Sequence, residues 1–107
     1  MEERVLISLL IDFYGALLTE RQLQCLQLHH EDDLSLAEIA DQLGVSRQAV
    51  HDNLQRALQL LHSYEDRLHL VAQYEKREQL IDQMKAELNA ATINKAAMNH
   101  LLAQMEG

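Results

Sequence analysis

Side chains that can recognise the edges of nucleic-acid bases follow one another along the middle of the chain. Arginine forms paired hydrogen bonds with guanine, and glutamine does the same with adenine, in the major groove. Both residue types occur at the start of an expected helix, and three further polar side chains share its outward side. This pattern predicts a nucleic-acid-binding site that consists of Arg47, Gln48, His51, Gln55 and Arg56.

The charge of the chain is unfavourable for such a site. The formal net charge is −8 at pH 7, and residues 19–63 hold seven acidic side chains against three basic ones. Non-specific affinity for nucleic acid comes from lysine and arginine side chains that neutralise phosphates. We therefore expect weak binding by a monomer, which a dimer would strengthen through avidity. The alternative is that this surface only faces solvent or binds a protein.

Other residues could bind a metal or catalyse a reaction, but their spacing favours neither. His29 and His30 precede the acidic run 31–33, yet neighbours in sequence rarely converge on one ion, so we expect a solvated loop. His62 and His69 are seven residues apart and would share a helix face if the helix is unbroken, but we expect them on the surface or half-buried. The chain has no glycine-rich phosphate loop, His-Glu-x-x-His pair, nucleophile elbow or cysteine cluster. We expect no enzyme activity, no cofactor and no metal site.

The composition predicts an all-α fold. Proline is absent, glycine occurs three times, and 48% of the residues are hydrophobic although few are aromatic, a mixture that favours helices over strands. The single cysteine, Cys25, cannot form an internal disulfide and is expected to be buried, which indicates a reducing, cytoplasmic setting. The apolar stretch 1–18 contains Asp12 and two early glutamates, so we expect neither a membrane span nor an export signal.

Helix signals occur along the first third of the chain. Residues 3–17 are apolar on nearly every side, which predicts a central helix. Thr19 and Gln22 form a capping-box pattern, in which both side chains bond backbone amides near a helix start, so a second helix is expected over 20–30. The polar run 29–33 predicts a loop at its end.

A helix-turn-helix pattern follows. Ser35 and Glu38 form a second capping box ahead of an expected helix over 36–43, and Gly44 can adopt the left-handed conformation that turns the chain. Ser46 then caps the next helix. The inward stripe of that helix has spacings of three and four and consists of Val50, Leu54, Ala57, Leu58, Leu61, Tyr64, Leu68 and Val71. These signals together predict a small helical domain in which two helices cross.

Beyond this motif the chain is expected to stay helical. The apolar pattern loses its phase across 73–79, where we expect a break, and restarts as a narrow, coiled-coil-like seam that includes Lys95. The other seam residues are Ile81, Met84, Leu88, Ala91, Met98, Leu102 and Met105. Such a seam must be buried, either against the small domain or, as we favour, against a second chain. We therefore expect a helix-turn-helix domain over 1–70 and a long C-terminal helix over 71–107 for dimerisation or docking.

Residues 12–68 resemble the YlxM family of small bacterial helix-turn-helix proteins. The motifs that carry the resemblance are DFY, LLT-x-RQ, DDLSL-x-EIA and VSRQAV-x-DN. The family is similar to region four of bacterial sigma factors, so the resemblance implies a fold of that type. Its genes neighbour those of the signal recognition particle GTPase and its receptor, which implies a regulatory or accessory role in that pathway. Here His51, Asp52 and Asn53 stand where sigma region four tends to carry basic residues, and this departure argues against promoter-like binding.

Two functional hypotheses follow. The first is a dimeric regulator in the signal recognition particle pathway that binds nucleic acid, either operator DNA or the RNA of the particle. The second is an adaptor that binds protein and no duplex. In that case the acidic surface would bind a basic partner such as the GTPase of the particle, and the methionine-containing seam would dimerise or dock.

Overall fold

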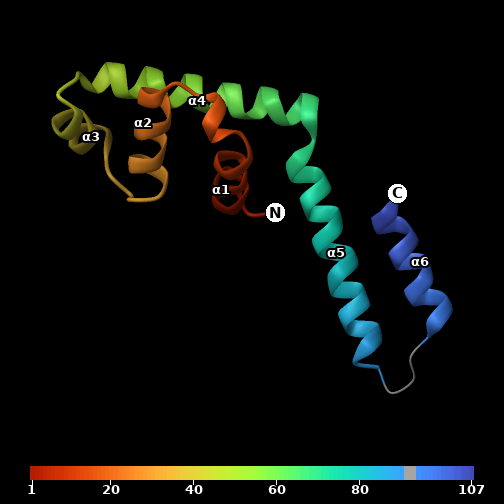
Figure 1. The fold of residues 1–107 in the computed structure, drawn as a ribbon. Coiled ribbons are helices and arrows are strands. Elements are labelled where there is room, and N and C mark those ends of the chain that lie inside the picture. The colour runs from red at the N-terminus through yellow and green to blue at the C-terminus, as the bar shows by residue number, and fades with distance from the viewer. Residues whose placement is uncertain (91–93) are drawn as a thin grey trace. The chain divides into compact units, whose positions relative to one another are not determined.

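The computed structural model describes residues 1–90 and 94–107, and the regular elements in these ranges are all helical (Figure 1). They are α1 (Glu3–Tyr14), the short 3-10 helix η1 (Gly15–Leu17), α2 (Glu20–His30), α3 (Leu36–Leu43), α4 (Arg47–Leu68), α5 (Leu70–Leu88) and α6 (Lys95–Glu106). The chain divides into two compact units, Met1–Val71 and Ala72–Gly107. The prediction of an all-α fold is therefore confirmed.

The local signals of the helix-turn-helix form as predicted. Both capping boxes are present, at Thr19 and Ser35, and each hydroxyl accepts a hydrogen bond from a backbone N–H of the first helical turn. Gly44 ends α3 with a φ of 67°, in the left-handed region where a side chain would be strained. The Ser46 hydroxyl accepts from the Ala49 N–H (3.0 Å) and caps α4. The starts of α2, α3 and α4 are thus set by their own short sequences.

One side of α4 lies at the centre of the core of the first unit. α1, α2 and α3 all contact α4. The buried residues of α4 are Val50, Leu54, Ala57 and Leu61, with Leu58 partly buried beside them. The helices around it contribute Leu10, Ile11, Tyr14, Cys25, Leu26, Ile39 and Ala40. The predicted stripe is confirmed from Val50 to Leu61, Tyr64 is partly buried against the core and Val71 is buried, and Cys25 is buried as expected.

The prediction of an apolar, central first helix is wrong. α1 buries Leu10, Ile11 and Tyr14, whereas Val5 is 47% exposed and Leu17, in η1, is 56% exposed. α1 contacts α2 and α4 through one side. Because only that side enters the core of the first unit, apolar residues elsewhere on the helix remain accessible. An apolar composition on every side therefore did not indicate burial on every side.

The junction between α4 and α5 lies at His69. This residue has a φ of 57°, a left-handed conformation that ends α4, and α5 begins at Leu70. The predicted break across 73–79 is wrong, since α5 is continuous there. Leu68, which was expected to face inward, is exposed. His62 and His69 consequently do not share an uninterrupted helix.

Hydrogen bonds of the buried Tyr14 side chain stabilise this junction. Its hydroxyl donates to Glu65 Oε1 (2.7 Å) and accepts from the Leu70 N–H (3.1 Å). The Val71 N–H donates to the same Glu65 oxygen (2.9 Å). The first amides of a helix have no partner within the helix, so these side chains satisfy two such amides of α5. Burial raises the pKa of Tyr14, and the hydrogen bond to Glu65 raises it further.

The second unit contains most of α5 and all of α6. Because α5 ends at Leu88 and α6 begins at Lys95, the prediction of one long C-terminal helix with a continuous seam is wrong. The Asn94 side chain caps α6 by accepting from the Ala97 N–H (3.0 Å), and the Asn94 N–H donates to the carboxylate of Glu87. Since α5 and α6 are separate helices, the helical phase on which the continuous seam depended is interrupted.

The predicted seam residues differ in exposure. Leu88 and Leu102 are exposed. Ile81, Met84, Met98 and Met105 are half-buried within the described residues, and Ala91 lies outside them. Leu80, which was not predicted, is buried and lines a shared hollow with Met105. Part of the apolar surface of this unit is therefore covered by the unit itself.

Replacing Tyr14 by phenylalanine tests the junction. Tyr14→Phe keeps the ring but removes one hydrogen-bond partner from both the Glu65 carboxylate and the Leu70 N–H. We expect the free energy of unfolding, measured by urea denaturation with circular dichroism, to fall by about 2 kcal/mol. Tyr64→Phe is the matched control, because the two rings lie 6.0 Å apart and the Tyr64 hydroxyl makes no hydrogen bond with the described residues.

The pH dependence of stability gives a second test. The pKa of Tyr14 in the folded chain lies above the ordinary value of 10.0, so the unfolded chain loses this proton first as the pH rises. The stabilisation is complete below pH 10.0 and is lost as the pH rises toward the folded pKa. Above pH 10.0 the wild type should lose stability more steeply than Tyr14→Phe. Equal slopes would show that the hydroxyl does not stabilise the fold.

Candidate nucleic-acid interface

Six polar side chains form two rows along the exposed side of α4. Side chains four residues apart lie above one another on a helix. One row consists of Arg47, His51 and Gln55, and the other consists of Gln48, Asp52 and Arg56. All six are exposed. The structure therefore brings the five predicted residues together on one surface, with Asp52 among them.

The packing of α3 against α4 positions the start of these rows. The Val45 N–H donates to the Ala40 carbonyl (3.1 Å), a bond that closes the turn around Gly44. Ala40 and Val50 are both buried. Because this side of α4 is fixed in the core, the helical period directs Arg47 toward solvent at the first turn.

Asp52 changes the chemistry of both rows. Its carboxylate accepts a hydrogen bond from the Gln48 side-chain amide (2.9 Å) and lies 3.5 Å from His51 Nδ1. Gln48 would have to give up this bond to contact a base edge. The negative charge also lies between Gln48 and Arg56 and repels phosphate. The exposed side of α4 thus combines side chains that can recognise bases with a carboxylate, that of Asp52, that opposes the binding of nucleic acid.

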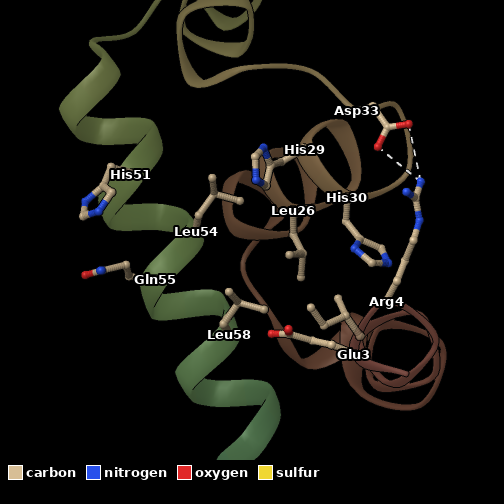
Figure 2. A pocket seen from close by; sticks show the side chains of 11 residues that line it. Glu3, Arg4, Leu26, His29, His30, Asp33, His51, Leu54, Gln55 and Leu58 are labelled. Atoms are coloured by element: carbon tan, nitrogen blue, oxygen red, sulfur yellow. Dashed lines mark hydrogen bonds and ion pairs between the residues drawn. The ribbon is translucent and has the colours of Figure 1, made fainter. Parts of the chain in front are cut away.

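A pocket of about 390 Å³ adjoins the first row (Figure 2). It lies between α1, α2 and α4, and His51 and Gln55 contribute to its lining. Figure 2 shows Leu26, Leu54 and Leu58 pointing into the space between these helices. The full lining is Glu3, Arg4, Ile7, Leu26, His29, His30, Asp33, His51, Leu54, Gln55 and Leu58. Two residues of the predicted site therefore also border an apolar hollow.

The rim of this pocket is organised by polar contacts across elements. Arg4 pairs with Asp33 at 3.2 Å between Nη2 and Oδ1. His29 Nδ1 lies 2.9 Å from the Leu34 carbonyl, and His30 Nε2 lies 3.0 Å from the Ser8 hydroxyl. Three of the residues that suggested a solvated acidic loop, His29, His30 and Asp33, thus form one wall of a pocket. The sequence pattern did not indicate it, because its partners on α1 lie far away in sequence.

The described residues include no group of three or more histidine, cysteine, aspartate or glutamate side chains arranged to hold a metal ion. Their helices include none that is both long enough and apolar enough to cross a membrane. Burial raises the pKa of the Cys25 thiol, against a smaller opposite effect of Arg21, so the thiol is protonated at neutral pH and is a poor nucleophile.

Comparison with known proteins identifies relatives of this helix-turn-helix chain. A UPF0122 protein of Clostridium perfringens is 47% identical over 89 residues, which cover 83% of this chain and 80% of that protein. A UPF0122 protein of Symbiobacterium thermophilum is 48% identical over 90 residues, or 84% of each chain. A UPF0122 protein of Streptococcus pyogenes is 48% identical over 80 residues, which cover 75% of this chain and 71% of that protein.

The family model agrees with these relatives. The model described as "Putative helix-turn-helix protein, YlxM / p13 like" matches residues 1–101, which include both the helix-turn-helix and most of the C-terminal unit. The resemblance to YlxM that the motifs indicated is therefore confirmed, and the chain belongs to the UPF0122 family of YlxM/p13-like helix-turn-helix proteins.

Proposed function

We propose that this chain is a regulatory helix-turn-helix protein that binds nucleic acid through the N-terminal half of α4. It would act in the cytoplasm as a binding protein and not as an enzyme. The observation that carries the proposal is the exposure of Arg47 and Gln48 on the first turn of a helix whose opposite side is held in the core. The resemblance to YlxM supports a place in the signal recognition particle pathway, with operator DNA or the RNA of the particle as the target.

The charge balance indicates how such binding would behave. The Met1–Val71 unit holds twelve acidic and five basic side chains. Few phosphates can therefore be neutralised, and the affinity should be low and limited to a few contacts near Arg47 and Arg56. Specific contacts to bases would have to supply much of the binding free energy.

A homodimer would increase this affinity, and we propose one that the C-terminal unit mediates. Leu88 is 59% exposed and Leu102 is 44% exposed, which leaves apolar surface for a second copy. Two linked copies that contact one nucleic acid bind more tightly than either alone. Since α5 and α6 are separate helices, the contact would involve the exposed residues of each and not one continuous seam.

A protein-binding adaptor of the signal recognition particle GTPase, without DNA binding, is the second candidate function. The contacts of Asp52 with Gln48 and His51 favour it, because they engage the side chains that would recognise bases. An acidic first unit also suits a basic protein partner. The two candidates differ in a simple observation, namely whether purified protein binds nucleic acid at low salt.

Fluorescence anisotropy with Arg47→Ala tests the first candidate. The purified protein is titrated into a labelled duplex pool and into signal recognition particle RNA at several salt concentrations. We expect Arg47→Ala to reduce the affinity by about 1–3 kcal/mol, because it removes the contact nearest the base edges. Arg67→Ala is the control, since Arg67 is an exposed arginine in the last turn of the same helix. Flat titrations of the wild type at low salt would exclude nucleic-acid binding and favour the adaptor.

Substitution of Asp52 should increase the affinity for nucleic acid, whereas substitution of Arg47 should lower it. Asp52→Asn removes the negative charge beside Arg56 and weakens the hold on Gln48. We expect the affinity for nucleic acid to increase roughly two- to five-fold at low salt, with a smaller gain at high salt. Asp66→Asn, an equal charge change at an exposed position near the end of α4, should leave it nearly unchanged. An equal gain in both variants would indicate a general charge effect and no local site.

Analytical ultracentrifugation tests the dimer. Leu88→Glu together with Leu102→Glu places charge on the exposed apolar surface without entering the core, so the chain should still fold. We expect this variant to sediment as a monomer under conditions in which the wild type is a dimer. Asn99→Glu adds a charge at a nearby exposed polar position and should leave the dimer intact. If the double variant is still a dimer, the dimer contact involves another surface.

A further inference from the structure

The pocket between α1, α2 and α4 combines an apolar floor with a polar edge that includes the Glu3 carboxylate (Figure 2). We propose that it binds a basic, amphipathic helical segment of a partner protein, one of whose apolar side chains fills the pocket. This inference goes beyond nucleic-acid binding and does not depend on it.

The floor of the pocket is formed by apolar residues from three helices. They are Ile7 of α1, Leu26 of α2, and Leu54 and Leu58 of α4. Leu26 and Leu54 are buried, whereas Ile7 and Leu58 are half-buried and border the opening. A volume of about 390 Å³ is in the range of pockets that enclose organic groups. A large apolar side chain that enters here would exclude water mainly from Ile7 and Leu58, since Leu26 and Leu54 are already buried, and this loss of hydrated apolar surface is the driving force for docking.

The polar edge of the pocket, which also includes His29, His30 and His51, offers the Glu3 carboxylate to a cation. Figure 2 shows the Glu3 carboxylate directed into the same space as the leucines. The Glu3 side chain makes no hydrogen bond or ion pair with any residue that the structure describes. Arg4, the arginine of the lining, is already paired with Asp33 (3.2 Å). A lysine or arginine beside the apolar anchor would therefore meet an unused carboxylate.

The same charges disfavour other occupants. A phosphate group that approached the leucines would meet Glu3, while the charge of Arg4 is engaged by Asp33. A helical segment suits the geometry, because an apolar residue and a lysine or arginine three or four positions away share one face. The apolar residue would occupy the floor while the cation reached Glu3.

A labelled model peptide provides the probe. It contains about 15 residues, only leucine and lysine, with leucine at spacings of three and four. Anisotropy gives its affinity for the full chain, and amide shifts in two-dimensional NMR locate it. We expect the largest shifts at Ile7, Leu26, His29 and Leu58, which line the pocket. A peptide with glutamate in place of lysine should not bind.

Matched variants distinguish the pocket from general attraction to an acidic protein. Glu3→Gln should weaken peptide binding by about two- to five-fold, whereas Glu2→Gln, one residue earlier and outside the lining, should not. Leu58→Ala should weaken it by about ten-fold. Leu60→Ala is its control, since Leu60 is half-buried on α4 but does not line the pocket. Arg47→Ala should leave peptide binding unchanged, whatever it does to nucleic-acid binding.

Pocket shifts together with the difference between Glu3→Gln and Glu2→Gln would support the proposal. The absence of binding, shifts on another surface, or equal losses in those two variants would overturn it. Pocket shifts that depend on protein concentration without peptide would identify a second copy as the occupant, which would also overturn it. Glu3→Gln keeps the test decisive if Leu58→Ala fails to fold, because Glu3 is exposed.

Discussion

The burial of one side of α4 is the constraint on which the first unit depends. Val50, Leu54, Ala57 and Leu61 must leave water together, and full burial of a valine or leucine side chain contributes about 1.5–3 kcal/mol. α1, α2 and α3 contact α4 and cover this side. The same burial fixes the rotation of the helix about its axis. It therefore also decides which polar side chains of α4 face solvent, so stability and the candidate interface have one common cause.

The sequence predicted the features that depend on neighbouring residues. The capping boxes, the left-handed Gly44 and the stripe to Leu61 are read from residues within one or two helical turns, and all were found. The junction at His69 could not be predicted in this way, because it involves hydrogen bonds between Tyr14 and Glu65, 51 positions apart. The separation of α5 from α6 was missed because the apolar spacing of the sequence continues from one to the other, while Asn94 and Glu87 supply the competing polar bonds.

The candidate site was predictable to a similar extent. Five exposed residues on one side of α4 follow from the helical period once the buried side is known. The hydrogen bond from Gln48 to Asp52 depends on the side-chain rotamers as well as on the spacing of the two residues. The sequence indicated only that the negative charge of Asp52 lies near Gln48. The pocket was beyond prediction. Its wall joins Arg4 to Asp33 across 29 positions, and only the packing of α1 beside α2 brings them together.

His51 and Gln55 belong to two surfaces at once, since they stand in the exposed row of α4 and also line the pocket. A single rigid helix cannot present these side chains to two bulky ligands at the same time. Any two partners that both cover them are competitors, and each raises the apparent dissociation constant of the other by a factor that grows with its own concentration. The concentration of one partner then sets the occupancy of the other, and a helix of this kind acts as a selector between them without any change of conformation.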